Sequence, residues 1–172
     1  IWKYNQDISY SNTPFRDFLV ANDDSTYSFF SFITKYYSTS DTFPNFPAIK
    51  KIADDGKILW EYRYLNKDYK VFYKINKTSN NGIIGVGFYR YNKLKENDLY
   101  FNQYFGWISK LDKDGNLKWS RNFTDDQYGK AQCYLYDVTT LDNGDIITGG
   151  WLQQLQINPP IMTWVLHLDS MG

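Results

Sequence analysis

Histidine and cysteine are almost absent from this sequence, and each absence removes a class of site. His167 and Cys133 are the only residues of their kinds. One thiol cannot form an intrachain disulfide, and one histidine beside one cysteine gives no convincing basis for a zinc site or a nucleophile–histidine pair. The sequence therefore predicts no catalytic residue, no metal and no cofactor.

A charge excess and long apolar runs are missing as well. Lys plus Arg number 19 and Asp plus Glu number 19, so no overall field draws the chain to nucleic acid or to an anionic membrane. No apolar run approaches the ~20 residues of a spanning helix, which predicts no membrane insertion. The chain begins at Ile1 with no charged-then-apolar leader, and we expect a processed or truncated product.

Aromatic residues are abundant instead. Phe, Trp and Tyr make up 20% of the chain, with 16 Tyr, 12 Phe and 6 Trp. Aromatic and β-branched residues favour half-buried strands, whereas the scarcity of alanine disfavours helices. The composition therefore predicts an all-β protein.

A repeat of about 60 residues organises the sequence. Trp2, Trp60 and Trp119 lie 58 and 59 residues apart, and the turn glycines Gly56 and Gly115 each precede a tryptophan by four positions. A period of this size indicates a repeat architecture. The units are residues 2–59, 60–118 and 119–172.

Each unit carries a second turn in its middle. These turns are Asp24-Ser25, Asn81-Gly82 and Asn143-Gly144. An Asn-Gly pair between apolar runs predicts a hairpin in which both turn residues take positive φ. Strands are predicted on both sides of these turns and before the Asp-Gly turns, including residues 27–32, 83–89, 146–151, 47–53, 106–111 and 163–168.

Four short antiparallel strands per repeat, with a tryptophan in register, predict a β-propeller of three visible four-stranded blades. A stacked solenoid and a triplicated β-sandwich are the alternatives. Propellers have 4–8 blades, so we expect residues 1–172 to form a single segment of a larger ring, or a ring that another copy or chain closes. A further copy of the Asp-Gly turn begins at Asp169.

Two stretches resemble a known family. Residues 111–119 (LDKDGNLKW) and 141–150 (LDNGDIITGG) resemble the repeat of large secreted β-propeller proteins of the Bacteroidota, which the type IX secretion pathway often exports. The ending WVLHLDSMG resembles the strand before that family's C-terminal sorting domain. The Asp-x-x-Gly-x-x-x-Trp spacing is also distantly similar to the tryptophan-docking repeat of quinoprotein propellers. The resemblance implies a propeller fold and an extracellular or cell-surface location rather than an activity.

In an antiparallel blade, alternate connections lie at the same end of the strands, so short turns and long loops are predicted on opposite rims. The long loops include 33–46, 90–105 and 152–162 and are rich in aromatic residues. Such rings suit a binding surface for a protein or a glycan. The alternative, which the length of these loops favours, is that the rings fold back over the blade edge and form a small core for the loop. The candidate binding residues are Tyr36, Tyr37, Phe43, Tyr91, Tyr100 and Tyr104.

One acidic motif invites comparison with a calcium site. Asp112, Asp114 and Asn116 resemble the opening of an EF-hand loop, but Leu117 and the residues after it lack the further oxygen ligands. A tight turn in which the aspartates accept backbone hydrogen bonds explains the motif better.

The sequence thus predicts a non-enzymatic, exported propeller segment that serves as a binding module. In it Trp2, Trp60 and Trp119 would pack between blades, and Gly56, Gly82, Gly115 and Gly144 would form the turns. One alternative is a carbohydrate-active or quinoprotein-like enzyme with its catalytic residues in further blades. The other is a cargo or subunit of a secretion or surface-anchoring complex.

Overall fold

The computed structural model describes residues 15–23, 25–33, 47–64, 69–93, 101–124, 131–154 and 161–172. These residues form eleven strands and contain no helix, so the protein is all-β as predicted. The strands are β1 (Phe15–Asp23), β2 (Ser25–Ile33), β3 (Pro47–Ile52), β4 (Ile58–Arg63), β5 (Tyr69–Lys77), β6 (Ile83–Lys93), β7 (Phe101–Leu111), β8 (Leu117–Phe123), β9 (Ala131–Thr140), β10 (Ile146–Gln154) and β11 (Ile161–Leu168).

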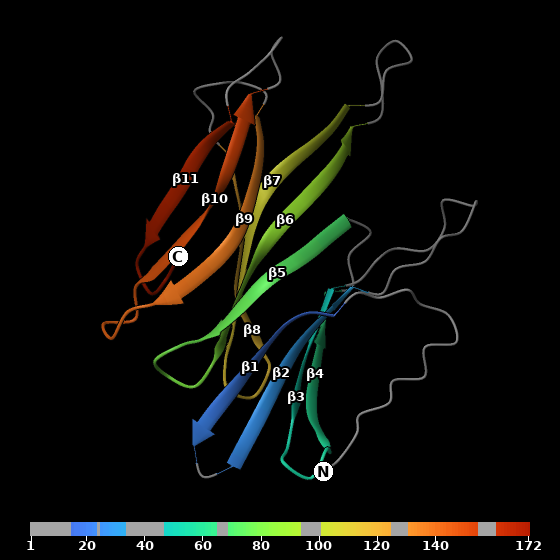
Figure 1. Ribbon diagram of the computed structural model, residues 1–172, viewed down its shortest axis with the longest axis vertical. Coiled ribbons are helices and arrows are strands. Elements are labelled where there is room, and N and C mark those ends of the chain that lie inside the picture. The colour runs from blue at the N-terminus through green and yellow to red at the C-terminus, as the bar shows by residue number, and fades with distance from the viewer. Residues whose placement is uncertain are drawn as a thin grey trace, which may run out of the picture.

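The strands form three separate antiparallel sheets, and each sheet is a simple meander of consecutive strands. The first sheet has the order β1-β2-β3-β4, the second β5-β6-β7-β8 and the third β9-β10-β11. Figure 1 shows the second sheet between the other two. Short turns join strands at one end of each sheet, and the longer connections join them at the opposite end, as the sequence predicted.

Two apolar layers hold the sheets together. The layer between the first and second sheets contains Ile49, Phe72 and Trp107, each fully buried. The layer between the second and third sheets contains Ile108 and Leu135, also fully buried. Alternate residues of β6 and β7 point into different layers, so both faces of these two strands are apolar. This is expected for strands that are buried between two other sheets.

The first strands of the three sheets lie side by side. β1 contacts β5, and β5 contacts β9. Side chains join their backbones: the Asp17 carboxylate accepts from the Ile75 N–H at 2.8 Å, and the Thr140 hydroxyl donates to the Lys77 carbonyl at 2.8 Å. The sheets therefore fan out from a common inner edge formed by β1, β5 and β9.

Five turns share one geometry. In each, the fourth residue donates its N–H to the carbonyl of the first residue at 2.9–3.1 Å. That fourth residue always has positive φ, as in a three-residue hairpin loop that ends in a left-handed residue. The fourth residues and their φ angles are Gly56 (88°), Asn81 (61°), Gly115 (84°), Gly144 (89°) and Gly172 (88°).

This geometry corrects the prediction for the Asn-Gly turns. In Asn81-Gly82 only Asn81 has positive φ, and in Asn143-Gly144 only Gly144 does. Asparagine tolerates the left-handed region because its short side chain can bond locally. Gly82 is needed for another reason: a Cβ there would lie 2.3 Å from the Leu111 carbonyl oxygen.

The sheets start one strand later than the sequence repeat. Trp60 lies in β4 and Trp119 in β8, so each tryptophan occupies the fourth strand of a sheet rather than the first strand of the next. The reason is local, since the turn before each tryptophan is a hairpin and pairs the two strands that it joins. Only three strands of the third sheet lie within the described part of the chain.

Candidate functional site

The structure describes two of the six predicted binding residues. Tyr36, Tyr37, Phe43 and Tyr100 lie outside the described residues, as does Trp2. Tyr91 and Tyr104 were expected in a loop over 90–105, but the structure places them in strands β6 and β7. The prediction of a long loop was wrong here, because aromatic residues favour extended backbone and lengthen both strands.

Tyr91 and Tyr104 point to opposite faces of the second sheet. Tyr104 pairs with Arg90, the neighbour of Tyr91, and successive side chains of a strand alternate between faces. The ring contacts agree with this placement: Tyr104 stacks on Tyr134 at 5.2 Å, whereas Tyr91 approaches Tyr89 at 6.3 Å. The structure therefore does not bring the two tyrosines into one surface.

A larger group of aromatic rings gathers where β5 meets β9. We call it the tyrosine cluster. Its members are Tyr69, Tyr73, Phe88, Tyr104, Tyr134, Tyr136 and Trp151. Phe88 lies at its centre, within 5.8 Å of four of the other ring centroids. The cluster thus joins the second and third sheets near their inner edge.

Two β-bulges position two rings of this cluster. Tyr73 is the extra residue of a bulge in β5, and Tyr136 is the extra residue of a bulge in β9. A bulge redirects a side chain out of the normal alternation. As a result the two rings stack on each other at 4.8 Å, across the contact between the sheets.

Glycines opposite the bulges allow this backbone geometry. Gly87 faces the bulge in β5, and a Cβ there would lie 1.8 Å from the Val71 carbonyl oxygen. Gly150 faces the bulge in β9, and a Cβ there would lie 1.7 Å from the Tyr134 carbonyl oxygen. Both glycines are thus required by close backbone approach.

Trp151 completes a platform with Tyr136. The indole ring stacks on Tyr134 at 4.5 Å, and its Nε1–H donates to the Tyr136 hydroxyl at 2.8 Å. Tyr136 is 42% exposed. We call Tyr73, Tyr134, Tyr136 and Trp151 the aromatic platform. Each of these rings is held by another ring or by a hydrogen bond.

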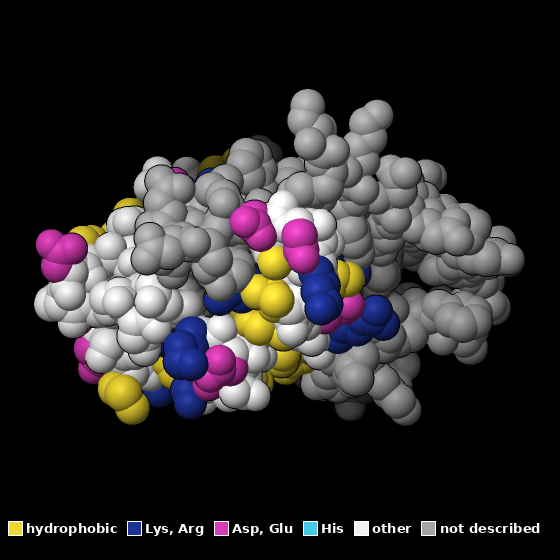
Figure 2. Space-filling model, turned by 90° about the horizontal axis from the view of Figure 1, so that it is seen from below, with side chains coloured by type: hydrophobic (Ala, Val, Ile, Leu, Met, Phe, Trp, Pro, Cys, Tyr) yellow, Lys and Arg dark blue, Asp and Glu magenta, His cyan; other side chains and the backbone are white. Residues whose placement is uncertain are grey.

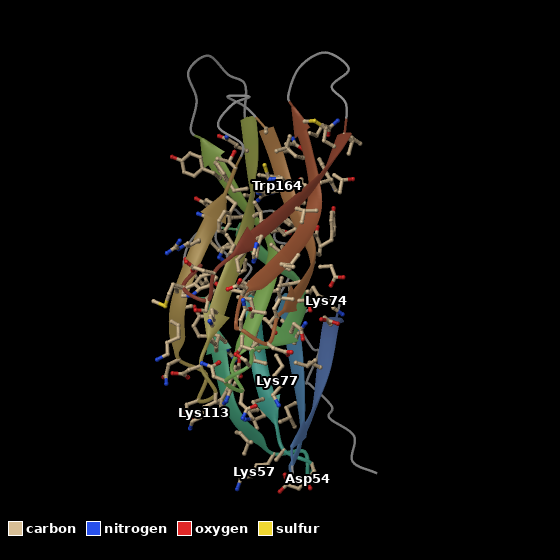
Figure 3. The ribbon with its side chains drawn as sticks, turned by 90° about the vertical axis from the view of Figure 1, so that its left-hand side faces the viewer. Asp54, Lys57, Lys74, Lys77, Lys113 and Trp164 are labelled. Atoms are coloured by element: carbon tan, nitrogen blue, oxygen red, sulfur yellow. The ribbon has the colours of Figure 1, made fainter. Side chains whose placement is uncertain are left out.

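Charged groups lie at the borders of the cluster. Lys74 forms an ion pair with Asp17 at 3.2 Å, across the β1–β5 contact, and Figure 3 shows Lys74 beside β1. The Arg90 guanidinium lies over the Tyr69 ring at 4.3 Å. Burial raises the pKa of Tyr134, and the neighbouring Tyr104 hydroxyl adds to the increase. The phenol therefore stays protonated and can donate a hydrogen bond.

A second aromatic site surrounds a buried lysine between the first two sheets. Lys70 is 3% exposed, and its Nζ donates to the Tyr64 hydroxyl at 2.7 Å. The same ammonium lies 5.0 Å from the ring centroids of Tyr89 and Trp107, which places it in a cation–π arrangement. Trp107 is fully buried and stacks on Phe72 at 4.3 Å. This site is closed to solvent, so it stabilises the layer rather than offering a surface.

The acidic motif at Asp112 is a turn, as expected. The carboxylate accepts hydrogen bonds from the N–H groups of Asp114 and Asn116 at 3.0 and 2.9 Å. These hydrogen bonds lower the pKa of Asp112 to about 2, and the bond from the Asn116 N–H has the largest effect. Among the described residues, no group of His, Cys, Asp and Glu side chains could hold a metal ion.

His167 has one acidic neighbour. Its Nε2 lies 3.0 Å from the Asp145 carboxylate, and the imidazole is mostly exposed on β11. The pair bridges β11 and the start of β10.

Charges of both signs are mixed at the short-turn end. Figure 2, which views this end, shows acidic and basic side chains beside one another around a strip of apolar side chains. Lys113 pairs with Asp114, and Lys118 pairs with Asp112. Asp54, Lys57 and Lys113 lie at this end in Figure 3. Such mixing produces no field of a single sign.

The tryptophans of the fourth strands contact the next sheet. The Trp60 Nε1–H donates to the Lys113 carbonyl in the β7–β8 turn at 3.1 Å. The Trp119 ring lies against Gly172, in the turn after β11. Of the predicted turn residues, Gly56, Gly115 and Gly144 each take the positive φ that their turn requires.

The platform residues were not among the candidates that the sequence suggested. One signal could have found them: Tyr73 and Tyr136 both lie five residues before the first residue of an equivalent turn, and each is followed by a charged residue. The bulges that redirect these rings leave no mark in the local sequence.

Comparison with known proteins gives no match: no protein-family model matches the chain, and neither does any curated protein. The part of the chain that the structure describes also contains no helix long and apolar enough to cross a membrane.

Proposed function

We propose that this chain is a segment of a β-propeller and that it acts as a binding module rather than as an enzyme. Three observations support the propeller. Consecutive meander sheets pack face to face, their first strands β1, β5 and β9 lie side by side, and the fourth-strand tryptophans contact the turn of the next sheet. Radial repetition of four-stranded sheets about an axis has these features.

The proposed setting is outside the cell or on its surface. Support comes from the resemblance of residues 111–119 and 141–150 to repeats of secreted Bacteroidota propellers. By the same resemblance, the type IX pathway would export the protein, and a secretion or surface-anchoring complex would be among its partners. The near absence of cysteine is compatible with export, because the apolar layers replace disulfides as the source of stability.

The proposal that this chain binds a ligand rests on the aromatic platform. Pre-stacked rings with polar tips provide contact area at little cost in side-chain entropy, and Tyr136 is the exposed ring of the platform. Tyr136 is 42% exposed and its hydroxyl accepts a hydrogen bond from Trp151, and Lys74 and Asp137 directly follow the two bulge residues on β5 and β9. A sugar has an apolar face, which can stack on aromatic rings, and hydroxyl groups, which can form hydrogen bonds with polar side chains. A glycan therefore suits this combination of groups. The proposed ligand is therefore a glycan.

Titration of the purified chain with soluble oligosaccharides of different composition tests this proposal, with tryptophan fluorescence as the readout. Tyr136→Ala should weaken binding by about 30-fold or more, as loss of a central aromatic anchor does. Tyr136→Phe keeps the ring but releases Trp151, so its effect should be smaller. Tyr91→Ala is the matched control, because Tyr91 is similarly exposed (46%) and lies outside the platform.

Two results would refute the glycan proposal. One is that no oligosaccharide changes the fluorescence at millimolar concentration. The other is that Tyr136→Ala and Tyr91→Ala bind equally well. Capture of a protein alone by the wild-type platform, lost in Tyr136→Ala, would show that the platform binds but that its partner is a protein.

A further inference from the structure

Arg90 is a cation at the border of the tyrosine cluster. It lies on β6 between its two cross-strand partners, Tyr69 of β5 and Tyr104 of β7. Its guanidinium lies over the Tyr69 ring at 4.3 Å. The Nε atom is buried and has no hydrogen-bond partner, and no carboxylate of the described residues pairs with this side chain. Within the described part of the chain, the cation therefore has aromatic neighbours but no anion.

The unused Nε–H calls for an acceptor from outside these strands. Buried N–H groups of folded proteins nearly always have a hydrogen-bond partner, and a buried charge without one costs free energy. The contact with the Tyr69 ring offsets part of this cost, but a ring face offers the N–H no oxygen. Lys74 differs, because its ammonium is already paired with Asp17 at 3.2 Å. Arg90 is thus the cation of this region that remains available to an anionic ligand.

Stacked rings connect Arg90 to the aromatic platform. Tyr104, opposite Arg90, stacks on Tyr134 at 5.2 Å, and Tyr134 stacks on Trp151 at 4.5 Å. Burial is the main cause of the raised pKa of Tyr134, and the charge of Arg90 acts in the opposite direction, so the cation lies within electrostatic reach of that hydroxyl. A ligand on the platform can therefore extend to Arg90, and the protonated Tyr134 hydroxyl can donate to it as well.

We propose that Arg90 binds a carboxylate of the glycan on the aromatic platform, so that the ligand is an acidic oligosaccharide built from uronic acids. The contact presupposes the proposed glycan-binding function of the platform. A guanidinium presents parallel N–H groups in one plane, which match the two oxygens of a carboxylate. A neutral sugar would leave the Nε–H without a charged acceptor. Because the chain has equal numbers of acidic and basic residues, selectivity for an acidic sugar comes from this local contact rather than from an overall field.

Paired ligands that differ only in charge test the carboxylate contact. The purified chain is titrated with oligomers of galacturonate, glucuronate and mannuronate and with the methyl ester of each, with tryptophan fluorescence as the readout. At least one acid form should bind about 10-fold or more tightly than its ester, as a hydrogen bond to a charged group allows. Arg90→Gln should abolish this difference by weakening binding of the acid form alone. Arg90→Lys keeps the charge without the planar pair of donors, so its preference for the acid form should be intermediate.

Arg121→Gln is the matched control. Arg121 lies on β8, and its guanidinium is 5.8 Å from the centroid of the Trp119 ring, so it makes the same kind of contact away from the platform. Its preference for the acid form should equal that of the wild type. Thermal unfolding without ligand shows whether Arg90→Gln keeps its fold; if it does not, Arg90→Lys decides by the same comparison.

Three results would overturn the carboxylate contact while leaving the glycan proposal in place. One is equal binding of the acid forms and their esters by the wild type. Another is a preference for the acid form that survives Arg90→Gln. The last is tighter binding of sulfated than of carboxylated oligosaccharides, lost in Arg90→Gln, which would identify the anion as a sulfate. Failure of every oligosaccharide, neutral or acidic, to bind would instead refute the proposed function itself.

Discussion

The indole ring of Trp60 lies against Gly115 of the neighbouring sheet, where a Cβ atom would come within 2.7 Å of indole Cδ2. Trp119 has the same relationship to Gly172, where a Cβ would lie 2.8 Å from Cζ2. Each glycine is also the left-handed residue of its turn. One residue therefore satisfies two demands, the backbone of a hairpin and the docking of the preceding sheet.

Because Gly115 has both roles, we expect Gly115→Ala to lower the stability of the fold strongly. The substitution forces a Cβ into a left-handed conformation and against the Trp60 ring, so the free energy of unfolding should fall by about 2 kcal/mol or more. Gly149→Ala is the matched control, because the nearest atom to its Cβ would be 3.6 Å away. Its effect should stay within about 0.5 kcal/mol. Urea denaturation measures both, and equal costs would contradict the docking role.

Replacing each of the two docking tryptophans by phenylalanine should change the free energy of unfolding by different amounts. The Trp60 Nε1–H bonds the Lys113 carbonyl, whereas the Trp119 Nε1 is buried and has no hydrogen-bond partner in the described structure. Trp60→Phe removes a hydrogen bond, while Trp119→Phe removes an unsatisfied donor. The unfolding free energy should fall by about 1 kcal/mol more for Trp60→Phe than for Trp119→Phe. Denaturant titration of both variants checks the order, and the reverse order would show that packing differences dominate.

The Asp112 turn should make stability depend on pH in the acid range. Hydrogen bonds from the turn lower the pKa of Asp112 from its ordinary value of 3.8 to about 2. The folded protein then binds the proton less readily than the unfolded chain, so this stabilisation is complete above about pH 4 and is lost as the pH falls towards 2. Asp112→Asn should show a smaller loss of stability across this window. Carboxyl NMR titration of Asp112 measures its pKa directly, and an unshifted value would refute the turn-capping role.

The turns show how far local sequence determines this fold. Asp-Gly and Asn-Gly pairs located the hairpins, because a tight turn needs a residue that accepts positive φ and these dipeptides supply one. The same signal assigned the wrong role to Gly82, whose missing side chain makes room for the Leu111 carbonyl of the neighbouring strand β7. Local rules thus predicted where the chain turns but not why each glycine is there.

The candidate site was harder to predict, because it depends on contacts between sheets. Tyr91 and Tyr104 share an aromatic segment, yet a strand period of two sends them to opposite faces. Tyr73 and Tyr136 come from different sheets and meet because two bulges redirect them. Sequence periodicity assumes regular alternation, so residues displaced by bulges escape it.

Alkaline pH should weaken the contact between the first two sheets. Burial raises the pKa of Tyr62 to about 12, and the charge that Tyr64 would carry adds to this increase. Since the folded protein holds the proton more tightly than the unfolded chain, Tyr62 contributes stability that is complete below its ordinary pKa of 10.0. This contribution is lost as the pH rises through about 12, because ionised Tyr62 would leave a charge in the apolar layer. Denaturant midpoints measured between about pH 9 and pH 11.5 should therefore fall more steeply in the wild type than in Tyr62→Phe, which keeps the ring without the titrating hydroxyl. Equal slopes in the two proteins would mean that Tyr62 ionises without leaving the layer, and that burial does not control its proton.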